Sequence, residues 1–138
     1  VVLPHSATDT DGICGHWQVT NTNDAVATWK LESRLIEGRL RHEPLPYPQD
    51  AETYARTVIE RTFDAETAAN SRLDATDVGV RTRTNHPNGA IEMTDNWLFV
   101  VDGENAWTLQ LSTPTRLMSD NEATLERIFD SMQVSDES

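Results

Sequence analysis

The segment from residue 90 to residue 111 constrains the fold more than any other part of the chain. Apolar side chains recur with a period of two before and after an Asp-Gly pair: Ile91, Met93, Trp97, Phe99 and Val101, then Trp107, Leu109 and Leu111. Such a period is typical of β-strands with one buried face. Asp102-Gly103 is a favoured tight turn between antiparallel strands. The sequence therefore predicts a long β-hairpin over these residues.

A helix is predicted after the hairpin. Ser119 and Glu122 have the spacing of a capping box, in which each side chain bonds the other residue's backbone N–H. Apolar residues then follow at positions i, i+3, i+4 and i+7, which places them on one helical stripe: Leu125, Ile128, Phe129 and Met132. The end of the chain is thus expected to be a sheet with a helix packed against it.

The rest of the chain adds shorter elements. Strands are predicted over 13–20, over 25–41 as one strand or two, and in the second half of 72–84. The alternation slips by one residue at Leu35-Ile36, which indicates a β-bulge. Asp50 is expected to cap a helix that ends near Thr62 or Phe63, and residues 64–67 a second capped turn. Residues 86–89, His-Pro-Asn-Gly, are predicted to form a turn.

These elements predict the order β-β-α-β-β-β-α. Helices that interrupt antiparallel strands favour an α+β fold with a largely antiparallel, twisted sheet and two main helices. The 138 residues are expected to form a single domain, with residues 1–12 and 134–138 as flexible ends.

The net charge of −12 limits the partners. The chain has 23 acidic and 11 basic residues, and its only lysine is Lys30. A field of this sign repels nucleic acid and anionic membranes. GC-rich codon usage, a high-salt habitat and a basic partner protein would each produce it. No apolar run reaches 18 residues, so no membrane span is expected.

The sequence offers no strong catalytic or metal-binding motif. Cys14 and His16 have the spacing of half a zinc site, but the chain has no second cysteine, and a buried thiol is the simpler interpretation of Cys14. Neither a Gly-rich phosphate loop nor a Gly-x-Ser-x-Gly elbow is present. We therefore predict no metal, no cofactor and no catalytic residue.

Basic residues are clustered in two of the predicted strands. These are Arg34, Arg39, Arg41 and His42 at the end of one strand region, and Arg81 and Arg83 on one face of another; the candidate binding residues among them are Arg39, Arg41, Arg81 and Arg83. If the strands are neighbours, these residues form a cationic stripe that suits carboxylate or phosphate, as in an anion or acidic-peptide site. The alternative is cross-strand pairing with acidic residues of the same sheet, namely Glu32, Glu37 or Glu92.

Two tryptophans complete the candidate binding residues. Trp17 and Trp29 lie in the early strands and could line an apolar groove for a partner. The alternative is that they pack in the core, as large aromatic side chains commonly do.

The C-terminal part of the chain resembles the Mog1/PsbP-like α/β/α sandwich. The resemblance covers roughly residues 48 to 134. It depends on the Trp107–Leu111 strand, on a Pro-containing exit from the hairpin, and on the terminal helix ending Phe129-Asp130-Ser131-Met132. Around Trp17 the chain departs from that group, because it lacks a Pro-then-Trp entry. Cys14 follows no apolar signal and does not match a lipidation site.

The group includes envelope lipoproteins and secretion-related adaptor domains. The resemblance implies a non-enzymatic binding or adaptor module that holds a protein or lipid partner, with a secreted or cell-envelope location favoured over the cytoplasm. One alternative is an acidic secretion chaperone or an immunity-type inhibitor of a basic client. Another is a small hydrolase or isomerase with a pocket. The oligomeric state and the partner's identity stay open.

Overall fold

The computed structural model describes the backbone of residues 2–4, 16–19, 27–31, 35–130 and 132–134, and the side chains of residues 35–130. The elements in chain order are β1 (Val2–Pro4), β2 (His16–Val19), β3 (Ala27–Leu31), β4 (Ile36–Pro44), α1 (Ala51–Thr62), α2 (Ala65–Asn70), β5 (Asp74–Ala75), β6 (Val80–Asn88), β7 (Ile91–Asp102), β8 (Asn105–Pro114), the 3₁₀ turn η3 (Thr115–Leu117), α3 (Met118–Asp130) and β9 (Met132–Val134).

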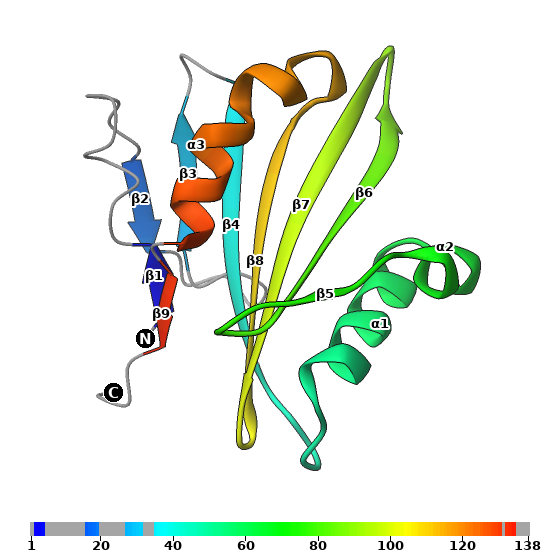
Figure 1. Ribbon diagram of the computed structural model, residues 1–138, viewed down its shortest axis with the longest axis vertical. Helices are drawn as coiled ribbons and strands as arrows, with labels where there is room; N and C mark the ends of the chain where they lie inside the picture. Colours follow the sequence, from blue (N-terminus) through cyan, green and yellow to red (C-terminus); the bar gives the residue numbers. More distant parts are fainter. Residues whose placement is uncertain (1, 5–15, 20–26, 32–34, 131, 135–138) are drawn as a thin grey trace.

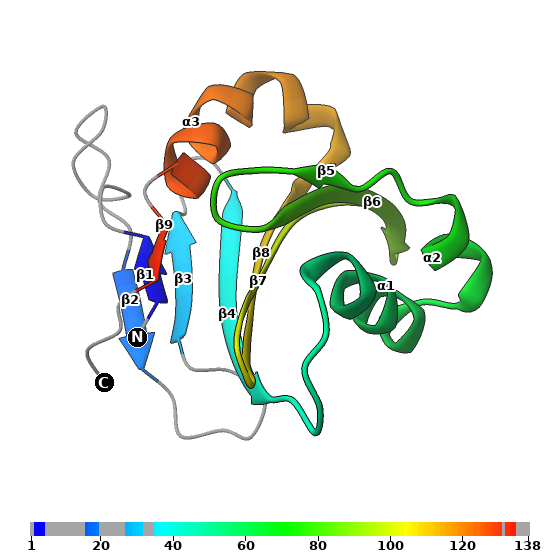
Figure 2. The same ribbon diagram turned by 60° about the horizontal axis from the view of Figure 1, so that its bottom comes forward.

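A seven-stranded antiparallel sheet organises the molecule. Its strand order is β2-β3-β4-β8-β7-β6-β5, and β1 pairs with β9 in a separate two-stranded sheet. The predicted hairpin, β7–β8, occupies the middle of the large sheet (Figure 1). Helix α3 covers one face of this sheet, and α1 and α2 lie on the other (Figure 2). The predicted α+β class, the antiparallel sheet and the sandwich of layers are confirmed.

Two apolar cores, one on each face, hold the layers together. The core under α3 contains Ile36, Leu40, Leu98, Val100, Leu109, Leu111, Leu125, Ile128 and Phe129. The core under α1 and α2 contains Leu45, Tyr54, Ala55, Val58, Ile59, Ala68, Val80, Trp97, Phe99 and Ala106. Strand β7 is buried on both faces from Thr94 to Val100. The sequence analysis predicted only one buried face for β7, because it counted the apolar residues at every second position and left out those between them.

The slip of phase at Leu35-Ile36 marks a turn between two strands, so the predicted β-bulge is wrong. Strands β3 and β4 pair antiparallel with Leu31 opposite Ile36. Leu35 has a φ of 56°, a left-handed conformation that reverses the chain direction in a way an extended strand does not. The break in alternation is therefore a change of strand.

The predicted N-terminal boundary of the last helix is also wrong. Pro114 ends β8, the chain continues as the η3 turn, and α3 begins at Met118, which places Ser119 in the first turn rather than at the cap. The other two predicted caps are confirmed. A carboxylate oxygen of Asp50 accepts from the Thr53 N–H at 2.7 Å, and one of Asp64 accepts from the Thr67 N–H at 2.7 Å.

Residues 86–88 belong to a strand instead of the predicted turn. Strand β6 continues to Asn88, and the chain reverses at Gly89-Ala90, where Gly89 has a φ of 67°. At the ends of the chain, Val2–Pro4 pairs with Met132–Val134. The other residues that were predicted to be flexible lie outside the described ones. That the chain forms a single domain stays a prediction.

Candidate functional site

The four predicted arginines do not form one stripe. Strands β8 and β7 lie between β4 and β6, so the two arginine pairs are not on neighbouring strands. Leu40 belongs to the core under α3, and its neighbours Arg39 and Arg41 therefore point to the α1 face. Arg81 lies opposite Leu98, which packs under α3, so Arg81 and Arg83 point to the α3 face. The predicted stripe is wrong, because two strands lie between the two pairs of arginines and the pairs point to opposite faces of the sheet.

Arg81 is held tightly on the α3 face. Its two terminal nitrogens donate to the two carboxylate oxygens of Glu126 in α3, at 2.7 and 2.9 Å. Its guanidinium carbon lies 4.2 Å from the centre of the Phe129 ring, and 22% of the side chain is exposed. The Nε atom is buried and has no hydrogen-bond partner. The partner of Arg81 is thus a helix residue, whereas the sequence suggested a cross-strand glutamate.

Arg83 and Arg72 lie nearby in more open positions. The Nε of Arg83 donates to the Asn96 side-chain oxygen at 2.9 Å, and its Nη2 lies 3.5 Å from a carboxylate oxygen of Glu122. The Nε of Arg72 donates to Asp74 at 3.1 Å. The exposed fractions of the two arginine side chains are 43% and 88%.

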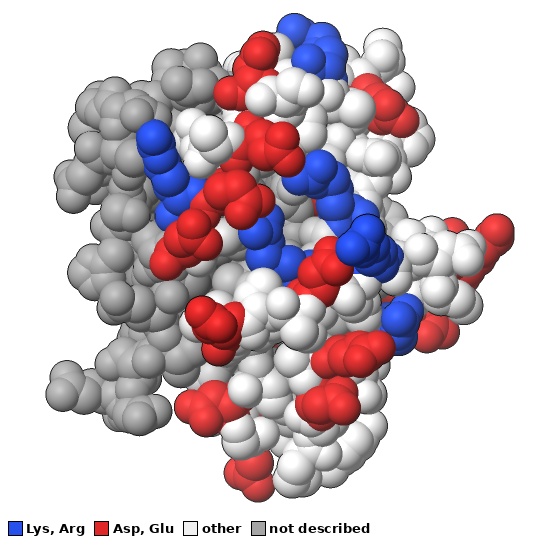
Figure 3. All heavy atoms as spheres, in the orientation of Figure 1, with Lys and Arg blue, Asp and Glu red and all other residues white. Residues whose placement is uncertain are grey.

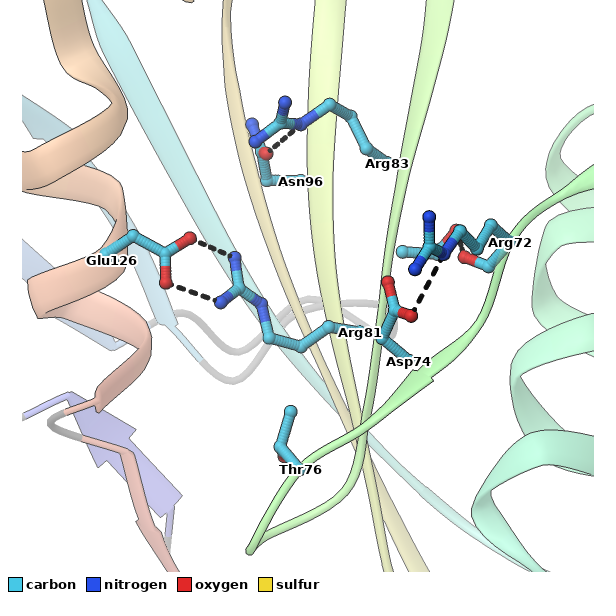
Figure 4. A pocket seen from close by; sticks show the side chains of 8 residues that line it. Arg72, Asp74, Thr76, Arg81, Arg83, Asn96 and Glu126 are labelled. Carbon is cyan, nitrogen blue, oxygen red and sulfur yellow. Dashed lines mark hydrogen bonds and ion pairs between the residues drawn. The ribbon is translucent and has the colours of Figure 1, made fainter.

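These arginines line a pocket of about 400 Å³, which we call the arginine pocket. Its other lining residues are Asp74, Thr76, Thr82, Asn96 and Glu126. In the close view, Arg81 from β6 and Glu126 from α3 reach toward each other, while Arg72 and Asp74 come from the segment that carries β5 (Figure 4). The space-filling view shows basic side chains gathered around a hollow in the middle of this face, with acidic ones around them (Figure 3).

The segment of residues 72–79 forms a wall of the pocket and is fixed by short polar bonds. The Thr76 N–H donates to the Gly79 carbonyl at 2.7 Å, and the Gly79 N–H donates to the Thr76 hydroxyl at 3.1 Å. The Thr82 hydroxyl donates to the Arg72 carbonyl at 2.7 Å. A Cβ added at Gly79 would lie 2.0 Å from the Phe99 carbonyl oxygen, so only glycine allows this segment to pack onto β7.

The charges of the pocket are close to balanced. Three guanidiniums face the carboxylates of Asp74 and Glu126, and Glu122 lies at the rim beside Arg83. The hydrogen bonds from Arg81 lower the pKa of Glu126, and its partial burial only partly opposes this effect. Glu126 is therefore ionised at neutral pH and pairs with Arg81 as a charged group.

A second pocket lies on the α1 face. It has a volume of about 520 Å³, and Arg41, Glu43, Tyr54 and Arg61 are among the residues that line it. One carboxylate oxygen of Glu43 accepts from the Tyr54 hydroxyl and from Arg61, both at 2.7 Å. Arg41 donates to the Gln110 side chain at 3.4 Å. The fourth predicted arginine, Arg39, is exposed and is not among the lining residues of either pocket.

The groups of this second pocket are tied into one network. Burial and the hydrogen bond to Glu43 raise the pKa of Tyr54 well above its ordinary value. Burial alone would raise the pKa of Glu43, but the bonds from Arg61 and Tyr54 outweigh it and lower that pKa. Tyr54 is thus a neutral donor, and Glu43 is charged and engaged by two partners.

The predicted tryptophans lie opposite each other. Trp17 in β2 is paired with Trp29 in β3, at the edge of the sheet away from the arginine pocket. Their side chains lie outside the described ones, so their role as a groove stays a prediction. Cys14 also lies outside the described residues, and the prediction of no metal stays open there. Within residues 35–130, no cluster of three acidic, histidine or cysteine side chains is arranged to hold a metal.

The sequence analysis missed a buried polar cluster around Asp95. This residue is fully buried in β7; one of its oxygens accepts from the Ser112 hydroxyl, and the other lies 2.9 Å from the Nδ1 of His86. The carboxylate therefore stands between the serine and the histidine. A base-activated nucleophile requires the histidine in that middle position, so these contacts do not make a catalytic triad. Arg72 was also missed, because nothing in its local pattern separates it from a loop residue.

Comparisons with known proteins bear on the fold. Neither a protein-family model nor a curated protein matches this chain. The solution structure of cyanobacterial PsbP (CyanoP) from Synechocystis sp. PCC 6803 is similar, with a TM-score of 0.55 and 12% sequence identity over 91% of this chain and 83% of that one. A crystal structure from Bacteroides thetaiotaomicron VPI-5482 is also similar, with a TM-score of 0.54 and 9% identity over 89% of this chain.

These comparisons confirm the predicted resemblance as a likeness of fold: the chain has the PsbP-like architecture. It spans less than half, 42%, of the Bacteroides protein. Fold similarity at such low identity does not transfer an activity or a partner. The described part of the chain also contains no helix with the length and apolar character needed to cross a bilayer.

Proposed function

We propose that this chain is a non-enzymatic binding module that holds a protein partner against its α3 face. The observation that carries the proposal is the arginine pocket, an open hollow lined by charged side chains that already bind a carboxylate and an amide of the chain itself. The same guanidinium groups are suited to recognise a partner protein, because they bind carboxylate and amide groups directionally. The PsbP-like fold supports the proposal by analogy.

Two features favour a protein over a nucleic acid or an anionic membrane as the partner. The net charge of −12 repels extended polyanions, and the charges of the pocket itself are close to balanced. The face around the pocket carries both signs of charge (Figure 3), as protein–protein contact surfaces commonly do at their polar rims. We propose an adaptor role in which the α3 face supplies the contact.

Site-directed photo-crosslinking tests the docking face. A photoreactive amino acid replaces Glu122, which is exposed on α3 beside the pocket, or Glu104, which is exposed in the β7–β8 turn, as the matched control. After irradiation in an extract of the source cells, we expect one protein adduct from position 122 and none from position 104. The same adducts from both positions, or none from either, would contradict the proposal.

The net charge favours a second candidate, an acidic chaperone or inhibitor that binds a basic client. Such a client would contact acidic side chains rather than the arginine pocket. Its adduct would disappear at high salt and would persist when Arg72 and Arg83 are both replaced by glutamine. A partner that binds the arginine pocket would instead no longer form an adduct with the doubly substituted chain.

A further inference from the structure

The arginines of the arginine pocket have more N–H donors than there are acceptor atoms bonded to them. Arg72 uses only its Nε, on Asp74, and Arg83 uses its Nε on Asn96 and its Nη2 near Glu122. Among the residues that the structure describes, the two terminal nitrogens of Arg72 and the Nη1 of Arg83 therefore have no protein partner. Both side chains are exposed at the mouth of the pocket, where a ligand can reach them.

The pocket already holds one carboxylate, which belongs to the chain itself. Glu126 occupies the fork of Arg81 with two short bonds, in the geometry that a guanidinium offers to any carboxylate. Glu126 is accessible from solvent, because 44% of its side chain is exposed. Arg81, in contrast, is fixed between Phe129 and the sheet. An incoming carboxylate could therefore replace Glu126 while Arg81 keeps its position and remains paired.

From this arrangement we propose that the arginine pocket binds the carboxylates of an acidic peptide segment in the partner protein. One carboxylate of that segment takes the place of Glu126 on Arg81, and others pair with Arg83 and Arg72 at the mouth. This inference depends on the proposed function and identifies the chemistry of the partner. The pairing of Arg81 with Glu126 is then an internal substitute for the ligand.

Size and charge favour a short acidic peptide over other anions. A volume of about 400 Å³ suits a small ligand group rather than a helix or a nucleic-acid strand. The carboxylate of Asp74 in the wall disfavours a continuous polyanion, while Thr76 and Asn96 offer polar atoms to peptide groups. The acidic remainder of the chain is screened over a Debye length of about 8 Å at physiological salt, so it affects a bound peptide only weakly.

Peptide titration followed by ¹H–¹⁵N NMR tests the inference. The probe is an end-blocked tetrapeptide with two aspartates, and its control is the same peptide with two asparagines. We expect saturable shifts of the Arg72 and Arg83 Nε–H signals and of the α3 amides around Glu126, with a dissociation constant on the order of 1 mM, in the range of weak complexes. Added salt should weaken this binding, and the asparagine peptide should cause no shift.

A double substitution assigns the binding to the pocket. Arg72→Gln with Arg83→Gln should weaken binding of the aspartate peptide at least about tenfold, the scale of losing charged contacts. The matched control, Arg39→Gln with Arg116→Gln, changes the net charge equally at exposed positions outside the pocket and should leave binding unchanged. Equal effects of the two double variants would overturn the inference.

The substitution Glu126→Gln tests the exchange. It removes the internal carboxylate, so the aspartate peptide should bind several-fold more tightly, with an otherwise unchanged amide spectrum as the check on folding. Unchanged or weaker binding would overturn the exchange. Shifts caused equally by inorganic phosphate, or binding only to vesicles of anionic phospholipid, would show that peptide carboxylates are not the ligand.

The two proposals fail in different ways. If the crosslinked partner is lost from the chain with Arg72→Gln and Arg83→Gln, but the aspartate peptide does not bind, the inference fails and the proposed function stands. If position 122 yields no partner at all, the proposed function fails, whatever the peptide does.

Discussion

Each face of the sheet carries an apolar core, but the two cores have different surroundings at their borders. On the α1 face, Trp97 stacks on Phe99 at a centroid distance of 5.6 Å, and Phe63 packs edge-on against Trp97 at 6.3 Å. The polar groups beside them, Tyr54 and Glu43, bond one another. On the α3 face the apolar core ends at Phe129, and the arginine pocket follows directly.

From this difference we expect the residues of the α1 face to determine mainly the stability of the fold, and the exposed arginines of the α3 face to determine mainly binding. These aromatic and polar side chains of the α1 face have their partners within the chain, so their loss should mainly lower the free energy of unfolding. On the α3 face, Arg72 and Arg83 are exposed at the mouth of the pocket and contribute little to that free energy, because exposed ion pairs are weak. Each of the following three substitutions tests this comparison, from the largest expected effect to the smallest.

Trp97→Ala should cause the largest loss of stability. Trp97 is completely buried, stacks on Phe99, and donates its indole N–H to the Thr84 hydroxyl at 2.9 Å. We expect the free energy of unfolding, measured in urea, to fall by about 3–5 kcal/mol. Tyr47→Ala, at an exposed aromatic residue, is the control and should change it by less than about 0.5 kcal/mol. Similar losses for both would break the contrast.

Gly79→Ala should lower stability by about 1–3 kcal/mol, because the new methyl group meets the Phe99 carbonyl and has no room. The shift of the segment should also change the NMR signals of Arg72 and Arg83 across the pocket. Gly103→Ala provides the control: Gly103 has a φ of 63° and open space around it, so the strain stays at the hairpin tip. If Gly103→Ala shifted the same arginine signals, the claim that Gly79 positions the wall of the arginine pocket would be refuted.

Glu126→Gln should have the smallest effect on stability, and this effect should depend on pH. Arg81 lowers the folded-state pKa of Glu126 below its ordinary value of 4.5. The ion pair therefore stabilises the fold fully above about pH 4.5, and its contribution is lost as the pH falls through the folded pKa. We expect a difference of about 0.5 kcal/mol at pH 7.

Urea unfolding of both proteins from pH 7 down to the acid range measures this difference. It should shrink steadily as the solution becomes more acidic, because the wild-type carboxylate gains the proton that glutamine mimics. A difference that stays constant or grows toward acid would mean that the pair does not behave as an ordinary exposed ion pair.

Much of the local structure could be predicted from the sequence. The hairpin and the caps at Asp50 and Asp64 depend on short-range patterns, and all three are confirmed. The two turn residues of the hairpin are Gly103 and Glu104 rather than the predicted Asp102 and Gly103, because Asp102 still pairs with Asn105. The start of α3 was misplaced because Pro114 and the η3 turn shift the helix by a few residues. The bulge at Leu35 was wrong because a slip of alternation has the same signature as a tight turn between strands.

The candidate site could be predicted only in part. Arg81 and Arg83 were correctly placed on one face of one strand, because their spacing of two fixes that relation. Their assumed companions, Arg39 and Arg41, lie on the other face. Arg72 and Glu126 were not anticipated, since they reach the pocket from a loop and a helix that are distant in the sequence.

The sequence by itself determined which side chains share a face of each element, because periods of 2 and 3.6 follow from backbone geometry within a few residues. Only the tertiary structure decided which elements are neighbours: that β8 and β7 separate β4 from β6, and that α3 brings Glu126 to Arg81. Pairing between distant segments depends on the packing of the whole chain, which a local period does not encode.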